Sequence, residues 1–280
     1  MILNLDKHFS PYGITNTIEY NYFTFSGGEP HIKIITDLKG VSEVTITHRI
    51  QSFNDLGILL LATNALKNMD IKKIKVLLPY FPAARQDRLM QTGEPLSVKV
   101  YADIINAQNY ESVTIFDPHS EVTPALLNNC KVIDNHTFIR QITQQLSDDL
   151  LLISPDGGAL KKIYKVAAHL QKYEVIEGSK SRNVRTGELT GFKVYADDLQ
   201  GKDCLIVDDI CDGGGTFLGL AQELKAKNAG NLYLAVSHGI FNNGFDKLEK
   251  VFSKIFTTDS FKTINHKNCE QVLLNRLINK

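Results

Sequence analysis

The chain has 280 residues, a length that suits one large or two medium α/β domains. Its 31 Lys and Arg balance 31 Asp and Glu, so the formal net charge at pH 7 is zero. This balance argues against non-specific binding to nucleic acid and against polybasic binding to membranes, because both need an excess of basic residues.

The N-terminal sequence and the cysteines indicate the compartment. The first residues lack a basic start followed by an apolar core, so we expect no signal peptide. The apolar stretch Leu56–Ala62 is far too short to span a bilayer. The four cysteines show neither a CxxC pair nor zinc-site spacing. We therefore expect a reduced, soluble, cytoplasmic protein with no nucleic-acid or membrane partner.

Apolar runs alternate with amphipathic segments along the chain, which indicates βαβ units. We predict an α/β fold with two similar domains, each a mostly parallel sheet flanked by helices. The polar Ser147-Asp148-Asp149 suggests a division into residues 1–147 and 148–280. The predicted strands are Lys75–Leu78, Val113–Phe116, Leu150–Ile153, Leu205–Val207 and Leu232–Val236, and the predicted helices are Asp55–Asn68, Ser97–Asn109, Thr137–Leu146, Ala159–Leu170 and Phe217–Lys227.

A cationic motif, Pro79–Arg88, follows the first of these strands. Arg85 and Arg88 flank Gln86 and Asp87. Arginine matches phosphate oxygens bidentately, while the amide and carboxylate can read a base edge or a ribose. By itself the motif favours a solvated loop with weak local ion pairs. Its position at a strand end favours a binding role.

Two further strands end in acidic turns. In an extended backbone the side chains of Asp117, His119 and Glu121 would point to one side, and an imidazole between carboxylates can hold a divalent ion or a phosphate. A single histidine is more often a surface residue or one whose hydrogen bonds are already satisfied.

Asp156 follows the Leu150–Ile153 strand, where the alternative is a plain Asp-Gly turn. Magnesium prefers such oxygen ligands.

The segment Gly178–Arg185 is a polar, basic loop between the apolar runs Tyr173–Ile176 and Phe192–Tyr195. A solvated charge run is the ordinary interpretation. Lys180 and Arg182 are two of its cations.

The most informative segment is Cys204–Thr216, where an apolar run ends in Asp208 and Asp209 and a glycine-rich turn precedes a helical pattern. Unpaired amides at a helix N-terminus bind anions, and carboxylates beside them suit sugar hydroxyls or a metal ion. The combination predicts a sugar-phosphate site. The alternative is a structural turn in which Asp212 caps the helix.

This segment resembles the 5-phosphoribosyl-1-pyrophosphate (PRPP) loop that phosphoribosyltransferases share with ribose-phosphate pyrophosphokinases, except that Gly213 replaces the usual first threonine. Pro79–Arg88 has every fixed position of the pyrophosphokinase ATP motif Pro-Tyr-Phe-x-x-Ala-Arg-Gln-Asp-Arg, which transferases lack, and Gly93–Lys99 continues the likeness. Phe25–Glu29 is similar to the family's Phe-Ser-Asp-Gly-Glu, with Gly27 at the aspartate position.

The resemblance implies a ribose-phosphate diphosphokinase that transfers the β,γ-pyrophosphoryl group of Mg-ATP to the 1-hydroxyl of ribose 5-phosphate, giving PRPP and AMP. It implies Mg²⁺ as cofactor and a homo-oligomer whose ATP site crosses a subunit interface. The implied residues are Phe25, Glu29, Arg85, Gln86, Asp87 and His119 for ATP; His119 and Asp156 for the metal; and Asp208, Asp209, Asp212, Gly213, Gly214, Gly215 and Thr216 for ribose 5-phosphate. The resemblance also implies a mobile catalytic loop in which Lys180 and Arg182 close over the reacting phosphates and stabilise their charge.

Two alternatives stay open at this point. A phosphoribosyltransferase would use the glycine loop but leave Arg85–Arg88 without a purpose. A non-catalytic regulatory subunit, as known among synthetase-associated relatives, would be expected to lose catalytic motifs, whereas Lys180, Arg182, His119 and Asp156 are all present.

Overall fold

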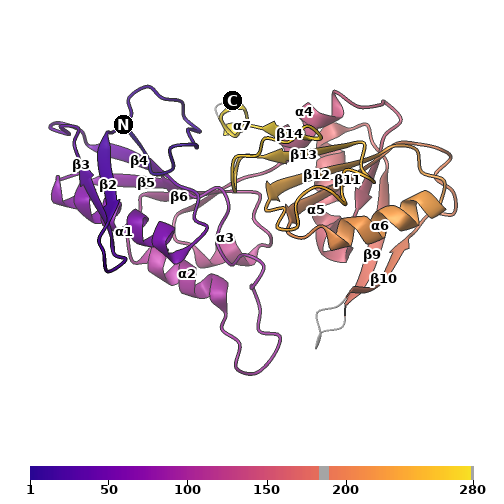
Figure 1. Ribbon diagram of the computed structural model, residues 1–280, viewed down its shortest axis with the longest axis horizontal. Coiled ribbons are helices and arrows are strands. Elements are labelled where there is room, and N and C mark those ends of the chain that lie inside the picture. Colours follow the sequence, from indigo (N-terminus) through magenta and orange to yellow (C-terminus); the bar gives the residue numbers. More distant parts are fainter. Residues whose placement is uncertain (183–188, 279–280) are drawn as a thin grey trace. The chain divides into compact units, whose positions relative to one another are not determined.

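The computed structural model describes residues 1–182 and 189–278, with side chains described for 1–180 and 191–278. The chain forms two compact units (Figure 1). The first contains Met1–Ile133 together with Leu274–Lys280, and the second contains Asp134–Leu273. The boundary therefore precedes the one suggested at residue 147, because helix α4 (His136–Thr143) packs against α5 (Gly157–Leu170) in the second unit.

The first unit is built on a five-stranded, fully parallel sheet with the order β1-β4-β5-β6-β7. Helix α1 begins at the cap Ser52, whose hydroxyl accepts a hydrogen bond from the Asp55 amide at 3.2 Å. The strands are Ile2–Asn4 (β1), Glu43–Thr47 (β4), Lys73–Leu77 (β5), Ser112–Phe116 (β6) and Cys130–Ile133 (β7), and the helices are Phe53–Asn68 (α1), Ser97–Asn106 (α2), Val122–Leu126 (α3) and Asn275–Ile278 (α7).

An antiparallel hairpin of β2 (Tyr20–Thr24) and β3 (Pro30–Ile34) forms a separate two-stranded sheet in this unit. It lies beside α1 (Figure 1). Ile32 is the buried contact of β3, whereas most of β2 is exposed. Exposure on both faces explains why no apolar pattern predicted these strands.

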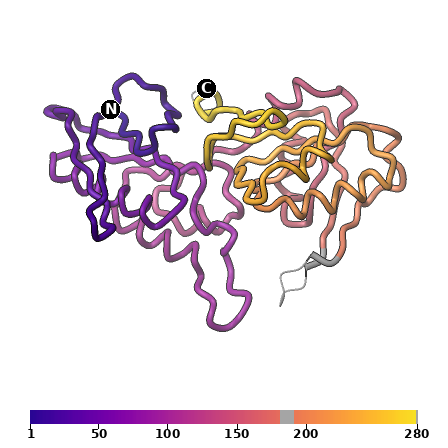
Figure 2. The backbone as a smooth tube through the Cα atoms, in the orientation of Figure 1, coloured from indigo at the N-terminus to yellow at the C-terminus, as the bar shows by residue number. Residues whose placement is uncertain are grey.

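The second unit contains a seven-stranded sheet with the order β10-β9-β8-β11-β12-β13-β14. All neighbours are parallel except β9 and β10, which form an antiparallel pair that Figure 2 shows side by side. The strands are Leu151–Ser154 (β8), Val175–Arg182 (β9), Leu189–Val194 (β10), Cys204–Cys211 (β11), Leu232–Gly239 (β12), Lys254–Thr258 (β13) and Cys269–Val272 (β14), and Gly215–Ala226 forms α6.

The helix after the glycine turn has the predicted buried stripe. Phe217, Leu220, Ala221 and Leu224 of α6 are all buried, at the spacing expected for one helix face. They join a core with apolar residues of β11 and β12, including Ile206 and Leu234. Within the described residues, no helix is both long and apolar enough to cross a membrane.

Three local expectations need correction. Strand β11 continues through Asp208 and Asp209 to Cys211, so the two acids lie inside a strand and not at its tip. Strand β9 runs to Arg182, so Gly178–Arg182 is paired with β10 and is not a loop. Asp117 has φ 38°, and Glu121 is helical at the start of α3, so residues 117–121 are not extended.

Candidate functional site

Three neighbouring strands of the second unit bring several predicted site residues to one sheet edge. In the order β9-β8-β11, Ser154 is level with Glu177, and Ile153 is level with Ile206. The strands are parallel, so the residues that follow these pairs emerge side by side. Lys180, Asp156 and the Asp208–Asp209 pair therefore meet at the carboxyl edge, where open α/β sheets bind ligands.

Asp156 caps α5 and holds Lys180. Its Oδ1 accepts hydrogen bonds from the amides of Gly158 at 2.8 Å and Ala159 at 3.0 Å, while its Oδ2 lies 2.5 Å from Lys180 Nζ. Burial raises the Asp156 pKa, but the Lys180 hydrogen bond and charge outweigh it, and the net pKa is lowered. Asp156 is therefore an ionised carboxylate and not only the polar residue of a turn.

The close approach of β9 to this turn depends on Gly178. A Cβ at position 178 would lie 2.6 Å from the Ser154 carbonyl oxygen and 3.1 Å from Leu220. Only glycine accommodates this approach without moving backbone. Gly178 thus allows the strand that carries Lys180 to run directly alongside Asp156.

Asp208 and Asp209 form a pair of acids in the sheet. Asp209 is 7% exposed, and its amide donates a 2.9 Å hydrogen bond to Asp208 Oδ1. Burial, and then the negative charges of Asp209 and Asp156, raise the Asp208 pKa well above its usual value. A bound cation or sugar hydroxyls would relieve this repulsion, so the pair is poised to accept one of them.

The glycine turn takes a backbone shape that presents amides. Gly214, and not Asp212, is the N-cap of α6, with φ 82° and no side-chain capping bond. The hypothesis of a simple Asp212 cap is therefore wrong. The first amides of a helix lack intrahelical partners, and a left-handed glycine before them turns successive N–H groups toward a common point. Residues 212–216 are shaped for an anion.

A second loop lies against this turn and was missed from the sequence. The loop after β12 donates backbone hydrogen bonds from Ile240 to the Cys211 carbonyl at 2.9 Å and from Asn242 to the Asp212 carbonyl at 3.0 Å. The Asn243 side-chain amide donates to the Gly213 carbonyl at 3.2 Å. Asn242-Asn243-Gly244 is a polar turn after a predicted strand of the same parallel sheet, which was the available signal.

In the first unit, the two nucleotide motifs leave neighbouring strands. Pairing continues beyond β5, since the Leu78 amide donates to the Thr114 carbonyl at 2.9 Å and the Phe116 amide to the Pro79 carbonyl at 3.0 Å. The loops after β5 and β6 therefore start together at one edge. Buried Phe81 and Ala84 anchor the first of these loops.

Because Phe81 and Ala84 anchor the loop after β5, its polar side chains are left at the surface. Arg85 and Gln86 are exposed and Asp87 is half-buried. His119 in the neighbouring loop is exposed as well. This edge thus presents a guanidinium, an amide and an imidazole near two strand ends, a set that suits phosphate and base recognition.

Phe25 and Glu29 lie in the turn of the β2–β3 hairpin. Phe25 is 52% exposed, and its ring packs edge-on against Phe23 at 4.8 Å. The Glu29 carboxylate lies over Gly27, where a Cβ would be only 2.5 Å from Oε2. A carboxylate therefore fills the space of the missing side chain at 27.

Figure 1 shows this turn apart from the loop between β5 and α2, so the chain does not bring the two parts together.

The predicted metal pair belongs to two units, His119 to the first and Asp156 to the second. Within either unit, no three described His, Cys, Asp or Glu side chains form a metal-binding group. Arg182 ends β9, and its side chain lies outside the described residues.

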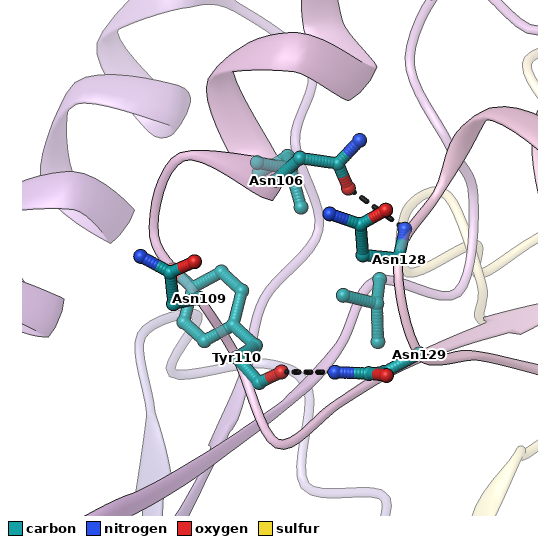
Figure 3. A pocket seen from close by; sticks show the side chains of 7 residues that line it. Asn106, Asn109, Tyr110, Asn128 and Asn129 are labelled. Atoms are coloured by element: carbon teal, nitrogen blue, oxygen red, sulfur yellow. Dashed lines mark hydrogen bonds between the residues drawn. The ribbon is translucent and has the colours of Figure 1, made fainter.

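A small cavity of about 100 Å³ lies in the first unit between the end of α2 and the starts of β6 and β7. Its asparagines serve the backbone: Asn106 accepts from the Asn128 amide at 2.8 Å, and Asn129 donates to the Tyr110 carbonyl at 3.0 Å (Figure 3). These bonds, at the amino ends of the strands, indicate a structural role.

A larger cavity of about 430 Å³ lies in the second unit between α4 and α5. It is lined by Arg140 and His169, which contact each other, and by Lys172, which pairs with Asp148. The Arg140 guanidinium lies in the last turn of α4, where a cation stabilises the negative dipole end, and it can only donate to His169 Nε2. Local contacts thus account for these side chains.

Two family models match the chain. Residues 7–108 match the N-terminal domain of ribose phosphate pyrophosphokinase, and residues 131–273 match the phosphoribosyl transferase domain. Ribose-phosphate pyrophosphokinase from Pyrococcus abyssi is 28% identical over 266 residues, which cover 93% of this chain and 90% of the relative. The Thermococcus kodakarensis enzyme is 29% identical over 88% of this chain and 87% of its own.

The fold has a solved counterpart. The structure of phosphoribosylpyrophosphate synthetase from Mycobacterium smegmatis superposes with a TM-score of 0.83 at 21% identity, covering 94% of this chain and 88% of that one. Because the N-terminal model is specific to pyrophosphokinases and not to phosphoribosyltransferases, the transferase alternative is not favoured. The chain belongs to the ribose-phosphate pyrophosphokinase family.

Proposed function

We propose that this chain is a ribose-phosphate diphosphokinase that converts ATP and ribose 5-phosphate to PRPP and AMP. The 1-hydroxyl oxygen of the sugar forms a bond to the β-phosphorus, and the bond from that phosphorus to the α–β bridging oxygen breaks. AMP leaves with the electron pair, and the hydroxyl proton is released. Such a displacement needs in-line positioning and neutralisation of phosphate charge more than covalent help from the protein.

Ribose 5-phosphate binds, in this proposal, along the edge of β11. Asp208 and Asp209 orient the sugar hydroxyls, and the amides of residues 212–216 hold the 5-phosphate. The observation that carries the proposal is the continuity of this segment: two acids inside the strand lead directly to the left-handed Gly214 and the start of α6. One end suits hydroxyls and the other suits an anion.

Lys180 and Arg182 are proposed to stabilise the transferring pyrophosphoryl group. The ion pair with Asp156 holds Lys180 at the carboxyl edge of the sheet, where ribose 5-phosphate is proposed to bind. When phosphates bind, the ammonium can exchange a carboxylate oxygen for phosphate oxygens with little movement. A cation positioned where charge develops lowers the barrier more than it strengthens ground-state binding.

Magnesium fits the donor set on this chain. Asp156, Asp208 and Asp209 are oxygen donors, and the pKa of Asp208 is raised first by burial and then by the negative charges of its neighbours, which a cation would offset. We propose that Asp156 and His119 help to hold Mg²⁺, which retains other ligands from water and substrate. When bound, the ion would neutralise phosphate charge.

The ATP site is proposed to use two segments of the first unit. Arg85, Gln86, Asp87 and His119 contact the nucleotide from the sheet edge, while Phe25 and Glu29 contact it from the hairpin. Their separation within one chain supports a homo-oligomer in which one subunit supplies the hairpin turn to its neighbour. The four free cysteines support a cytoplasmic location.

Phosphorus NMR of the purified protein with Mg-ATP and ribose 5-phosphate tests the reaction. Equal amounts of PRPP and AMP, without ADP, are expected. ADP with a singly phosphorylated sugar product would mean an ordinary kinase. Consumption of added PRPP with a nucleobase, and no need for ATP, would mean a phosphoribosyltransferase. An absence of turnover would favour a regulatory subunit.

A further inference from the structure

The loop after β12 places a side-chain amide where residue 213 has no side chain. A Cβ built on Gly213 would lie 2.7 Å from Asn243 Nδ2 and 3.5 Å from Asn243 Cγ. Gly213 is not one of the positive-φ glycines, so its backbone conformation is open to any residue. A side chain at 213 would therefore meet the Asn243 amide, which would have to turn away to make room.

Asn243 is held at this position by its own loop. The Asn242 amide is tied to the Asp212 carbonyl, and the Phe241 amide to the Cys211 carbonyl at 3.1 Å. Phe241 is buried and packs on Phe245 with ring centroids 4.6 Å apart. The loop is thus anchored on both sides of Asn243, and its amide meets the glycine turn in a defined way.

The amide has donor capacity beyond its bond to the turn. A side-chain NH₂ group carries two N–H donors, and the bond to the Gly213 carbonyl at 3.2 Å uses one. Asn243 is exposed, so its amide is accessible to a ligand at the start of α6. A neutral donor beside unpaired helix amides is suited to a phosphate oxygen.

We propose that Asn243 is a binding residue for the 5-phosphate of ribose 5-phosphate and supplies the side-chain donor that Gly213 lacks. The inference rests on the proposed function and extends it to a loop that is 30 residues away in sequence. Positions 213 and 243 share one space. A hydroxyl-bearing residue at 213 and an asparagine at 243 are then alternatives, each able to provide one donor.

The test uses four variants: Asn243→Ala, Asn242→Ala, Gly213→Thr, and the double variant Gly213→Thr/Asn243→Ala. Asn242 is the matched control because it is exposed in the same loop and binds the turn through its backbone. Calorimetry with ribose 5-phosphate measures binding without turnover, and steady-state kinetics gives KM and kcat separately.

Asn243→Ala should weaken ribose 5-phosphate binding and raise its KM by about tenfold, with kcat and the KM for ATP little changed, since one hydrogen bond to a charged group is lost. Asn242→Ala should bind as the natural protein does. Gly213→Thr should not improve binding alone, because its side chain meets the Asn243 amide. Combined with Asn243→Ala, the same threonine should restore most of the lost affinity.

Two results would overturn the inference while leaving the proposed function intact. One is equal binding by Asn243→Ala and Asn242→Ala. The other is a double variant no better than Asn243→Ala, which would make Asn243 only a support for the loop. If the natural protein neither binds ribose 5-phosphate nor turns it over, the proposed function itself fails, and this inference fails with it.

Discussion

Lys180 is the residue whose placement bears most directly on catalysis. It lies 2.5 Å from Asp156 at the edge where the acids of β11 also lie. We predict that Lys180→Ala lowers kcat by at least ~100-fold while ATP affinity stays nearly constant, because its charge acts mainly in the transition state. Single-turnover kinetics and nucleotide titration separate the two effects.

Lys193→Ala is the control for this prediction, since Lys193 is an exposed cation on β10, paired in register with Ser179 next to Lys180. It should leave kcat within a few-fold of the natural protein. A loss of ATP affinity as large as the loss of kcat would instead assign Lys180 to ground-state binding.

Asp208 predicts a pH dependence of stability. Its folded-state pKa is raised above the usual 3.8, so its contribution to stability is complete below that value and is lost as the pH rises through the folded-state pKa. In protein free of metal and substrate, Asp208→Asn should therefore have a higher Tm than the natural chain near pH 8 and a similar Tm near pH 4. The Asp208→Asn variant should have no activity at either pH.

Thermal unfolding in EDTA at several pH values measures this difference. Asp246→Asn, at an exposed carboxylate in the loop after β12, is the control and should show no such pH-dependent gain. A gain for Asp208→Asn that is equal at pH 4 and pH 8 would contradict ionisation of the buried Asp208 carboxyl as its cause.

At the scale of elements, α6 and β10 depend on each other through Gly219. A Cβ at this position would lie 2.1 Å from the Phe192 ring, so the ring packs directly on the helix backbone. We predict that Gly219→Ala destabilises the protein by about 1–3 kcal/mol through overpacking, despite the better helix propensity of alanine. Urea unfolding of the natural and variant proteins measures the change.

The smaller side chain in Phe192→Leu should relieve the contact, so the double variant should be more stable than the sum of the two single changes predicts. Strictly additive changes would show that Gly219 and Phe192 are not coupled.

The strands that could be predicted from sequence are those with continuous apolar runs. The runs Lys75–Leu78 and Leu232–Val236 are mostly buried in parallel sheets and correspond to β5 and β12. The β2–β3 hairpin escaped prediction because Tyr22 and Phe23 are exposed and give no alternation. The extension of β11 through Asp208 and Asp209 also escaped, because charged residues look like the end of a buried strand.

The candidate site shows the same division. Asp156 and Lys180 were predicted as site residues from motifs in their own segments, but their ion pair depends on the register of β8 with β9, which no local pattern specifies. The contact of Asn243 with Gly213 depends on where the loop after β12 meets the glycine turn. Such contacts between distant segments follow from tertiary packing and not from propensity.

At the scale of the whole molecule, the proposed sharing of the ATP site between subunits predicts complementation. Phe25→Ala and Arg85→Ala should each have little activity, because every ATP site of either homo-oligomer then lacks one of the two side chains. The mixed species formed on co-expression should have about half of the natural activity, since a mixed pair across a two-fold interface contains one fully intact site out of two. Purification through two different tags and an assay of the mixed species measures this.

Mixing the two proteins after purification, without subunit exchange, is the control and should give no recovery. If the co-expressed, doubly tagged species were as inactive as its parents, Phe25 and Arg85 would have to act within one subunit or in different sites.

The return of the chain to the first unit has a consequence for biosynthesis. Leu274 and Leu277 are buried, and they belong to the unit whose other residues end at Ile133. On the ribosome, the second unit emerges completely before the first can bury these two side chains. The unit that begins first is therefore finished last, and during translation it must wait, with part of its apolar surface uncovered, while about 140 residues of its neighbour are made and fold.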